Sequence, residues 1–148
     1  MNTVKVKLKN TSTNELKYGT KGAACFDIPA AGDIEWVRED KLHTAIIPTG
    51  LFFEIPEGYK INIFPRSGWG FKHNIQLANG TGIIDSDYRG EVKIKLIAHS
   101  CPLSLPEIKE GTRVAQAEIV PVYVAKFIES ETLGDTERGE GGFGSTGV

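Results

Sequence analysis

The chain contains many short apolar runs, and two of them alternate strictly between apolar and charged residues. Residues 4–8 read Val-Lys-Val-Lys-Leu, and residues 91–96 read Glu-Val-Lys-Ile-Lys-Leu. A period of two places the apolar side chains on one face of a β-strand and the charges on the other. Turn sequences with Gly and Pro separate the runs, so we expect an all-β sandwich, jelly roll or barrel. The expected strands are 4–8, 45–47, 51–55, 59–64, 75–77, 91–96, 114–120 and 122–127.

Composition agrees with this fold class. Ile and Val together number 24 against 10 for Leu and Met, which favours β-structure. Helical signals are few: Asp33 could cap one or two turns through Trp36, and Ser67 could cap a short helix through His73. At 148 residues and a net charge of −2, the chain is one globular domain in length. The hydrophobic content of 40%, the charged content of 24% and the small net charge exclude a disordered chain, a membrane-embedded one and a generally basic nucleic-acid binder.

Cysteine usage and the N-terminus point to one compartment. Cys25 and Cys101 are too few for a disulfide framework, and we expect two buried, inert thiols in a reducing cytosol. No apolar signal core or membrane-length run is present, so we expect no membrane partner. The histidines show no metal-ligand spacing, and we assign none of them to zinc.

Three stretches are richer in Gly, Arg, Asp and Ser than strands require. Pro65-Arg66-Ser67-Gly68 follows a predicted strand and could meet a phosphate, or could be a structural turn with an exposed arginine. Residues 79–91 place Asp85 beside apolar and aromatic neighbours, where a carboxylate can deprotonate a water, although a tight hairpin with solvated acids fits as well.

The third stretch is the C-terminal tail, where six of the 17 glycines fall within residues 134–148. By composition alone this is a disordered tail. It also offers a guanidinium, two hydroxyls and glycine amides, as a polyphosphate requires, and Phe143 could stack on a flat group.

Taken in order, these segments resemble the five motifs of the homotrimeric deoxyuridine triphosphate nucleotidohydrolases, the dUTPases. The matching segments are Ala-Cys-Phe-Asp-Ile at 24–28, Pro-Arg-Ser-Gly at 65–68, Gly-Ile-Ile-Asp-Ser-Asp-Tyr-Arg-Gly-Glu at 82–91, Gly-Thr-Arg-Val-Ala-Gln at 111–116, and Arg-Gly-Glu-Gly-Gly-Phe-Gly-Ser-Thr-Gly at 138–147. The third and fifth are too long for a chance match.

The resemblance implies a distorted jelly roll, or β-clip, with one short helix and a flexible C-terminal arm. It implies a β domain over residues 1–128 and an arm over 129–148 that closes over an active site of the trimer. The activity implied is that of a dUTP diphosphatase, Mg²⁺-dependent hydrolysis of dUTP to dUMP and pyrophosphate. This would limit uracil incorporation into DNA and supply dUMP for dTMP synthesis. The implied partners are dUTP and two further copies of the chain, with no stable nucleic-acid binding.

The resemblance also implies residue roles. Asp85 would activate the attacking water, Tyr88 would pack under the deoxyribose, and Asn79 would read the uracil edge. Asp27 would reach Mg²⁺ through water, and Phe143 would stack on uracil. The remaining implied substrate-binding residues are Arg66, Ser67, Gly68, Gly82, Ile84, Gln116, Arg138, Gly144, Ser145 and Thr146.

Two alternatives remain. A dCTP deaminase, or a bifunctional deaminase and hydrolase, shares the fold but needs a proton shuttle such as glutamate at the pyrimidine, where only Asp85 and Asp87 occur between residues 79 and 88. A nucleotide-switched regulatory protein could use the long 101–110 segment as a partner contact. Intact Asp85 and a complete arm motif favour catalysis.

Overall fold

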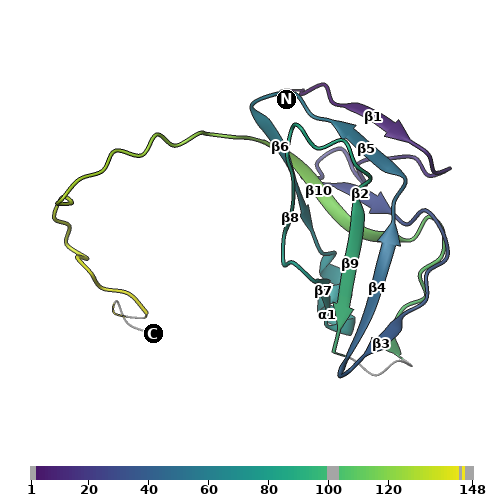
Figure 1. Ribbon diagram of the computed structural model, residues 1–148. Coiled ribbons are helices and arrows are strands. Elements are labelled where there is room, and N and C mark those ends of the chain that lie inside the picture. Colours follow the sequence, from purple (N-terminus) through teal and green to yellow (C-terminus); the bar gives the residue numbers. More distant parts are fainter. Residues whose placement is uncertain (1–2, 100–103, 144, 146–148) are drawn as a thin grey trace.

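The computed structural model describes residues 3–99, 104–143 and 145. Its strands form two four-stranded antiparallel sheets and one two-stranded ribbon (Figure 1). One sheet has the order β2-β10-β6-β8, the other β3-β4-β9-β7, and β1 pairs with β5. The all-β prediction is confirmed, because antiparallel strands make up nearly all of the regular structure. The elements are β1 Lys7–Asn10, β2 Phe26–Pro29, β3 Val37–Glu39, β4 Leu42–Pro48, β5 Leu51–Glu54, β6 Tyr59–Phe64, α1 Ser67–His73, β7 Ile75–Leu77, β8 Gly82–Ile84, β9 Lys93–Ala98 and β10 Arg113–Pro121.

The core draws on both four-stranded sheets and β5, and half of its buried hydrophobic residues are Ile or Val. Fully buried side chains include Ile28, Ile61, Ile47 and Leu96. On β9 the burial alternates along the strand, with Ile94, Leu96 and Ala98 buried and Lys93 and Lys95 exposed. On β9 the period-2 pattern therefore places its apolar face in the core, as the sequence predicts. The expected strand over 4–8 is displaced: β1 begins at Lys7, and all four of its residues are exposed.

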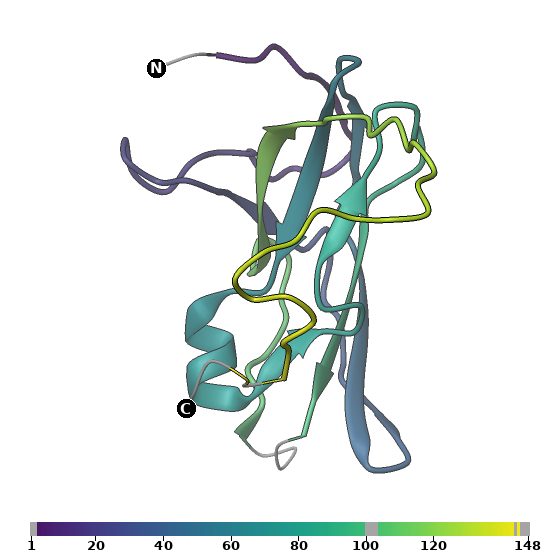
Figure 2. The ribbon, with the colours of Figure 1, turned by 90° about the vertical axis from the view of Figure 1, so that its left-hand side faces the viewer.

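The short helix lies at the end of the sheets away from β1 (Figures 1 and 2). It spans the residues that the sequence favours, but Ser67 is not its cap. Arg66 is the N-cap residue, and no side-chain hydrogen bond caps the helix. The helix ends at Asn74, which adopts a left-handed conformation and whose N–H donates to the Gly70 carbonyl.

Two expectations about local structure are wrong. Asp33 starts no helix: Ile34 forms a β-bridge to Ile108, and the Asp33 carboxylate instead accepts the N–H of Glu110 at 2.9 Å. Residues 122–127 form no strand, and the chain leaves the sheets after β10 and runs away from them (Figure 1). A strand needs a partner for its backbone groups. The Val122 N–H donates to the Gly58 carbonyl at 2.8 Å, but the segment forms no strand ladder with any of the described strands.

The segment after β10 exposes large apolar side chains. Tyr123, Val124, Phe127, Ile128 and Leu133 each expose more than four-fifths of their surface. Such a run in a solvated tail is unusual, because large contiguous apolar surfaces mark interaction sites.

Candidate functional site

The first cluster of predicted site residues lies where β8 leaves the sheet. Ile84 pairs with Ile61 of β6, and Gly82 pairs with Ile63. A Cβ at Gly82 would stand 3.0 Å from the Ile63 Cβ, so glycine allows this close pairing. The chain then turns at Asp85, whose carbonyl accepts the Tyr88 N–H at 3.2 Å.

Asp85, Tyr88 and Ile84 line one open cavity of about 380 Å³, together with Ile83, Glu91, Val92 and Lys93. The Asp85 side chain is exposed, and Tyr88 is 45% exposed with its ring on the cavity wall. We call these residues the nucleoside pocket, after the role that the motif implies. The described structure is not a regular hairpin here, since β8 and β9, the strands on either side of Asp85 and Tyr88, belong to different sheets.

Asn79 lies in the turn that carries the chain from one sheet to the other. The Asn79 carbonyl accepts the Thr81 N–H at 2.8 Å, and Gly80 has a φ of 70°. The Asn79 side chain is exposed on the β8 edge, where it can reach a ligand.

The second cluster surrounds the start of α1. The Asp27 carboxylate lies between two guanidinium groups, with Arg66 Nε 3.5 Å from Oδ1 and Arg113 Nη1 3.3 Å from Oδ2. Arg66 Nη1 also donates to the Arg113 carbonyl at 3.4 Å, and the Gln116 amide donates to the Pro65 carbonyl at 3.0 Å. These contacts tie residues 65–68, the phosphate loop of the motif, to β2 and β10.

Register explains why these residues meet. Gln116 of β10 pairs with Asp27 of β2 on one side and with Phe64 of β6 on the other. The end of β6 therefore delivers Arg66 beside Asp27, while Ser67 and Gly68 are exposed at the first turn of α1. The cluster carries two cations around one anion, which favours an anionic ligand.

Sequence reasoning missed Arg113 as a member of this cluster. It lies within the fourth motif segment, but its carboxylate partner is 86 positions away in the chain.

The two clusters lie at opposite ends of β6. Asp85 follows the residue paired with Ile61, near the start of the strand, whereas Arg66 follows its end at Phe64. At about 3.3 Å per residue, the two clusters are separated by about 15–20 Å along the strand. One chain does not bring Asp85 and the phosphate loop together.

The arm residues form a separate local structure. Arg138 Nε donates to the Gly141 carbonyl at 2.8 Å, and the Ser145 N–H donates to the Gly142 carbonyl at 3.0 Å. Phe143 has a φ of 50° and is fully exposed. Gly144 and Thr146 lie outside the described residues, as does Cys101 with the start of the 101–110 segment.

Cys25 lies two residues before Asp27 of the second cluster, and it is half-buried rather than buried as the sequence predicts. Burial, with smaller contributions from the Glu118 and Asp27 carboxylates, raises the pKa of its thiol. The thiol is therefore less reactive at neutral pH than a free cysteine.

No group of three or more His, Cys, Asp or Glu side chains suited to a metal ion occurs within residues 3–99, 104–143 and 145. Over the same residues, no helix has the length and apolar character needed to cross a bilayer.

Comparison with known proteins agrees with these observations. A family model described as dUTPase matches residues 11–147. A deoxyuridine 5'-triphosphate nucleotidohydrolase of Nautilia profundicola is 49% identical over 146 residues, covering 97% of this chain and 99% of that protein. The enzyme of the same name from Finegoldia magna is 44% identical, again covering 97% and 99%.

Solved structures show the same likeness. The dUTPase of Staphylococcus bacteriophage 80alpha, in a structure with dUPNHPP, superimposes with a TM-score of 0.78 at 30% identity and covers all of both chains. A dUTPase variant from phage phi11 of S. aureus, described with a structural Mg(II) ion, has a TM-score of 0.70 at 24% identity and covers 88% and 98%.

Proposed function

The chain belongs to the dUTPase family of enzymes, and we propose that it hydrolyses dUTP to dUMP and pyrophosphate at a site completed by several copies of the chain. Family membership over residues 11–147 supports the reaction. The separation of the two clusters along β6 supports the shared site, because a base must lie within about 3 Å of the water it activates. A homotrimer, the assembly that the motifs imply, would bring the nucleoside pocket of one copy to the phosphate loop of another.

In this proposal Asp85 is the general base. Its exposed carboxylate at the rim of the nucleoside pocket takes a proton from a water that attacks the α-phosphorus, and pyrophosphate leaves. General-base assistance contributes about 10²–10⁴-fold, and positioning and charge stabilisation supply the rest. Tyr88 packs under the deoxyribose and excludes a 2'-hydroxyl, Asn79 reads the uracil edge, and Gly82 and Ile84 shape the pocket wall.

The phosphate loop supplies donors to the leaving group. The Ser67 hydroxyl, the first-turn backbone at Gly68 and the Gln116 side chain hold phosphate oxygens. Arg66 supports them, and its contact with Asp27 holds the guanidinium in place before substrate arrives.

The arm closes the site. Phe143 stacks on the uracil ring, and Arg138, Ser145, Gly144 and Thr146 bind the γ-phosphate. Exposed Tyr123, Phe127 and Leu133 fit an arm that crosses to another copy, because that contact would bury apolar surface that one chain leaves in water. Closure expels water and strengthens the electrostatic contacts inside.

The donor chemistry fits a magnesium ion that arrives with the triphosphate. Mg²⁺ keeps several of its waters and takes few protein ligands. The Asp27 carboxylate offers about four acceptor positions, of which two guanidinium contacts occupy two, so it retains capacity for a metal-bound water. When bound, the ion would neutralise charge on the phosphate oxygens.

Product analysis tests the proposed reaction. Purified protein with Mg²⁺ is incubated with dUTP, dTTP, dCTP and UTP in turn, and the products are separated by chromatography. We expect dUMP and pyrophosphate from dUTP at a rate well above that of the other nucleotides. Equal hydrolysis of dTTP and dUTP, or uridine nucleotides formed from dCTP, would contradict the proposal, and the latter result would support the deaminase alternative.

A further inference from the structure

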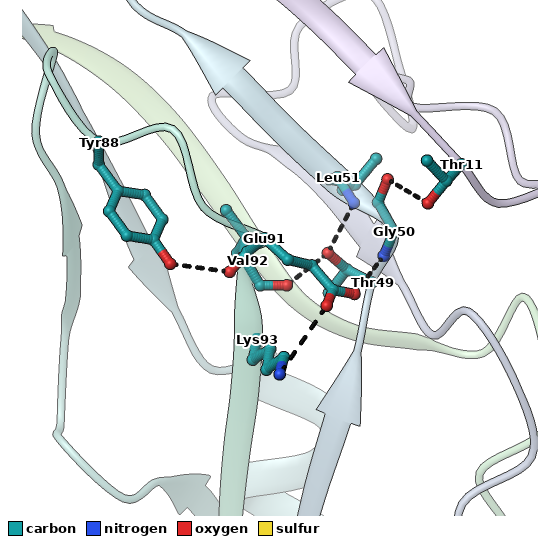
Figure 3. Close-up of polar contacts among 8 residues, drawn as sticks. All are labelled: Thr11, Thr49, Gly50, Leu51, Tyr88, Glu91, Val92 and Lys93. Carbon is teal, nitrogen blue, oxygen red and sulfur yellow. Dashed lines mark hydrogen bonds and ion pairs between the residues drawn. The ribbon is translucent and has the colours of Figure 1, made fainter.

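One carboxylate anchors the far end of the segment that carries Tyr88. Glu91 Oε1 accepts the Gly50 N–H at 3.0 Å, and Oε2 lies 4.0 Å from Lys93 Nζ (Figure 3). The Glu91 side chain is 24% exposed, whereas its partner Lys93 is 61% exposed. The bond to Gly50 is therefore the better protected of the two contacts.

The turn that receives Glu91 is itself fixed. The Gly50 carbonyl accepts both the N–H and the hydroxyl of Thr11, at 2.9 and 3.2 Å. Gly50 has a φ of 68°, and a Cβ there would stand 2.9 Å from the Ser12 nitrogen. The Thr49 hydroxyl, which is fully buried, donates to the Val92 carbonyl at 2.6 Å and accepts the Leu51 N–H at 3.2 Å.

Tyr88 reaches this anchor through its hydroxyl. The Tyr88 O–H donates to the Glu91 carbonyl at 3.1 Å, and Figure 3 shows the ring extending from its own backbone toward Glu91. A side chain at Gly90 would overlap the Tyr88 ring, so glycine there leaves room for this position. The contacts run from the 49–51 turn to Glu91, and from Glu91 to the Tyr88 ring.

We propose that Glu91 is a positioning residue that holds the Tyr88 ring against the sugar and thereby sets the discrimination between dUTP and UTP. The inference rests on the proposed function and deepens it. Residues 85–92 form no strand, and a backbone hydrogen bond to β5 holds only the end of this segment, where the Val92 N–H donates to the Leu51 carbonyl at 2.9 Å. The Glu91 carboxylate adds a contact to the same turn at the residue whose carbonyl accepts the Tyr88 hydroxyl. The tyrosine ring can exclude a 2'-hydroxyl sterically only if the ring stays in place. A ring carried by an unsupported loop would move away from the sugar.

The test compares kcat/KM for dUTP and for UTP in wild type, Glu91→Ala and Glu91→Gln. We expect Glu91→Ala to lower the dUTP/UTP ratio of kcat/KM about tenfold, or about 1.4 kcal/mol. The effect should appear mainly as faster turnover of UTP and a higher KM for dUTP, with kcat for dUTP within about threefold. Glu91→Gln should keep most of the ratio, because its amide oxygen can still accept the Gly50 N–H.

Two controls separate positioning from loss of stability. Ile108→Val removes a buried methylene far along the chain from the anchor and should lower the melting temperature while leaving the ratio within about twofold. Glu39→Ala breaks an exposed ion pair between Glu39 of β3 and Lys95 of β9, 3.6 Å in length, and should change neither quantity. A ratio that falls as far in Ile108→Val as in Glu91→Ala would overturn the proposal, because it would then follow stability.

A double-mutant cycle tests whether Glu91 acts through Tyr88. Tyr88→Phe loses the bond to the Glu91 carbonyl, so adding Glu91→Ala should change the ratio by less than about twofold. If the two substitutions instead lower the dUTP/UTP ratio additively, Glu91 does not act through Tyr88, and the proposal is overturned. Should Glu91→Ala not fold, Tyr88→Phe alone must still lower the ratio, and an unchanged ratio would refute the inference.

The results also distinguish a failure of the Glu91 proposal from a failure of the proposed dUTP hydrolysis. If wild type hydrolyses dUTP selectively but Glu91→Ala keeps the full ratio, the inference alone fails. If wild type hydrolyses neither nucleotide, the proposed function fails and the inference fails with it.

Discussion

The buried Thr49 hydroxyl gives a stability prediction that follows directly from its contacts. Thr49→Val keeps the side-chain shape but leaves the Val92 carbonyl and the Leu51 N–H without their hydroxyl partner in a fully buried site. An unsatisfied buried polar group costs about 1–3 kcal/mol, so the two together should lower the free energy of unfolding by about 2–4 kcal/mol. For a chain of this size that corresponds to a fall in melting temperature of about 5–15 °C.

Urea unfolding followed by tryptophan fluorescence measures this change, with thermal unfolding as a second readout. Wild type and variants must be compared at one protein concentration, because assembly contributes to apparent stability. Thr20→Val, at an exposed position, is the matched control and should change stability by less than about 0.5 kcal/mol. A loss in Thr49→Val no larger than in Thr20→Val would refute the argument that this hydroxyl satisfies two buried backbone groups.

Three further predictions concern the site. Asp85→Asn should abolish turnover but retain binding of a non-hydrolysable dUTP analogue by calorimetry; substantial turnover would remove Asp85 as the base. Truncation after Leu133 should lower kcat/KM for dUTP at least about 100-fold while leaving the melting temperature within about 3 °C, because the removed residues lie outside the core. In a Cys101→Ser background, Cys25 should be alkylated more slowly than free cysteine at pH 8, with its rate rising at a more alkaline pH, because burial raises its pKa. An alkylation profile that matches free cysteine would contradict the last prediction.

Local sequence patterns predicted the first and last residues of some elements correctly. β6 and β7 have the bounds that their apolar runs indicate, and α1 spans the expected residues. β2, β3 and β8 were not predicted, because each has only three or four residues and too short an apolar pattern to stand out from a turn. The expected strand at 122–127 failed for a different reason: its composition suits a strand, but no strand among the described residues lies beside it.

The motifs located the candidate site residues but not their grouping. Asp27, Arg66 and Gln116 meet because β2, β10 and β6 are neighbours in one sheet. The order of strands in a sheet is a tertiary property, and no local sequence pattern specifies it. The same register separates Asp85 from Arg66 within a chain. Arg113 and Glu91 were quoted within motifs without a role, since each acquires one from a partner distant in sequence.

Activity in mixed assemblies tests the shared site most directly. Asp85→Asn removes the proposed base in the nucleoside pocket, and Arg66→Ala removes the proposed support of the phosphate loop. The two inactive variants are refolded together in equal amounts and assayed for dUTP hydrolysis. If each site takes its pocket and its phosphate loop from different copies, about one quarter of the sites are intact in both parts, and about a quarter of wild-type activity returns. Activity no greater than that of the two variants assayed separately would show that a single chain holds both parts, and would contradict the account.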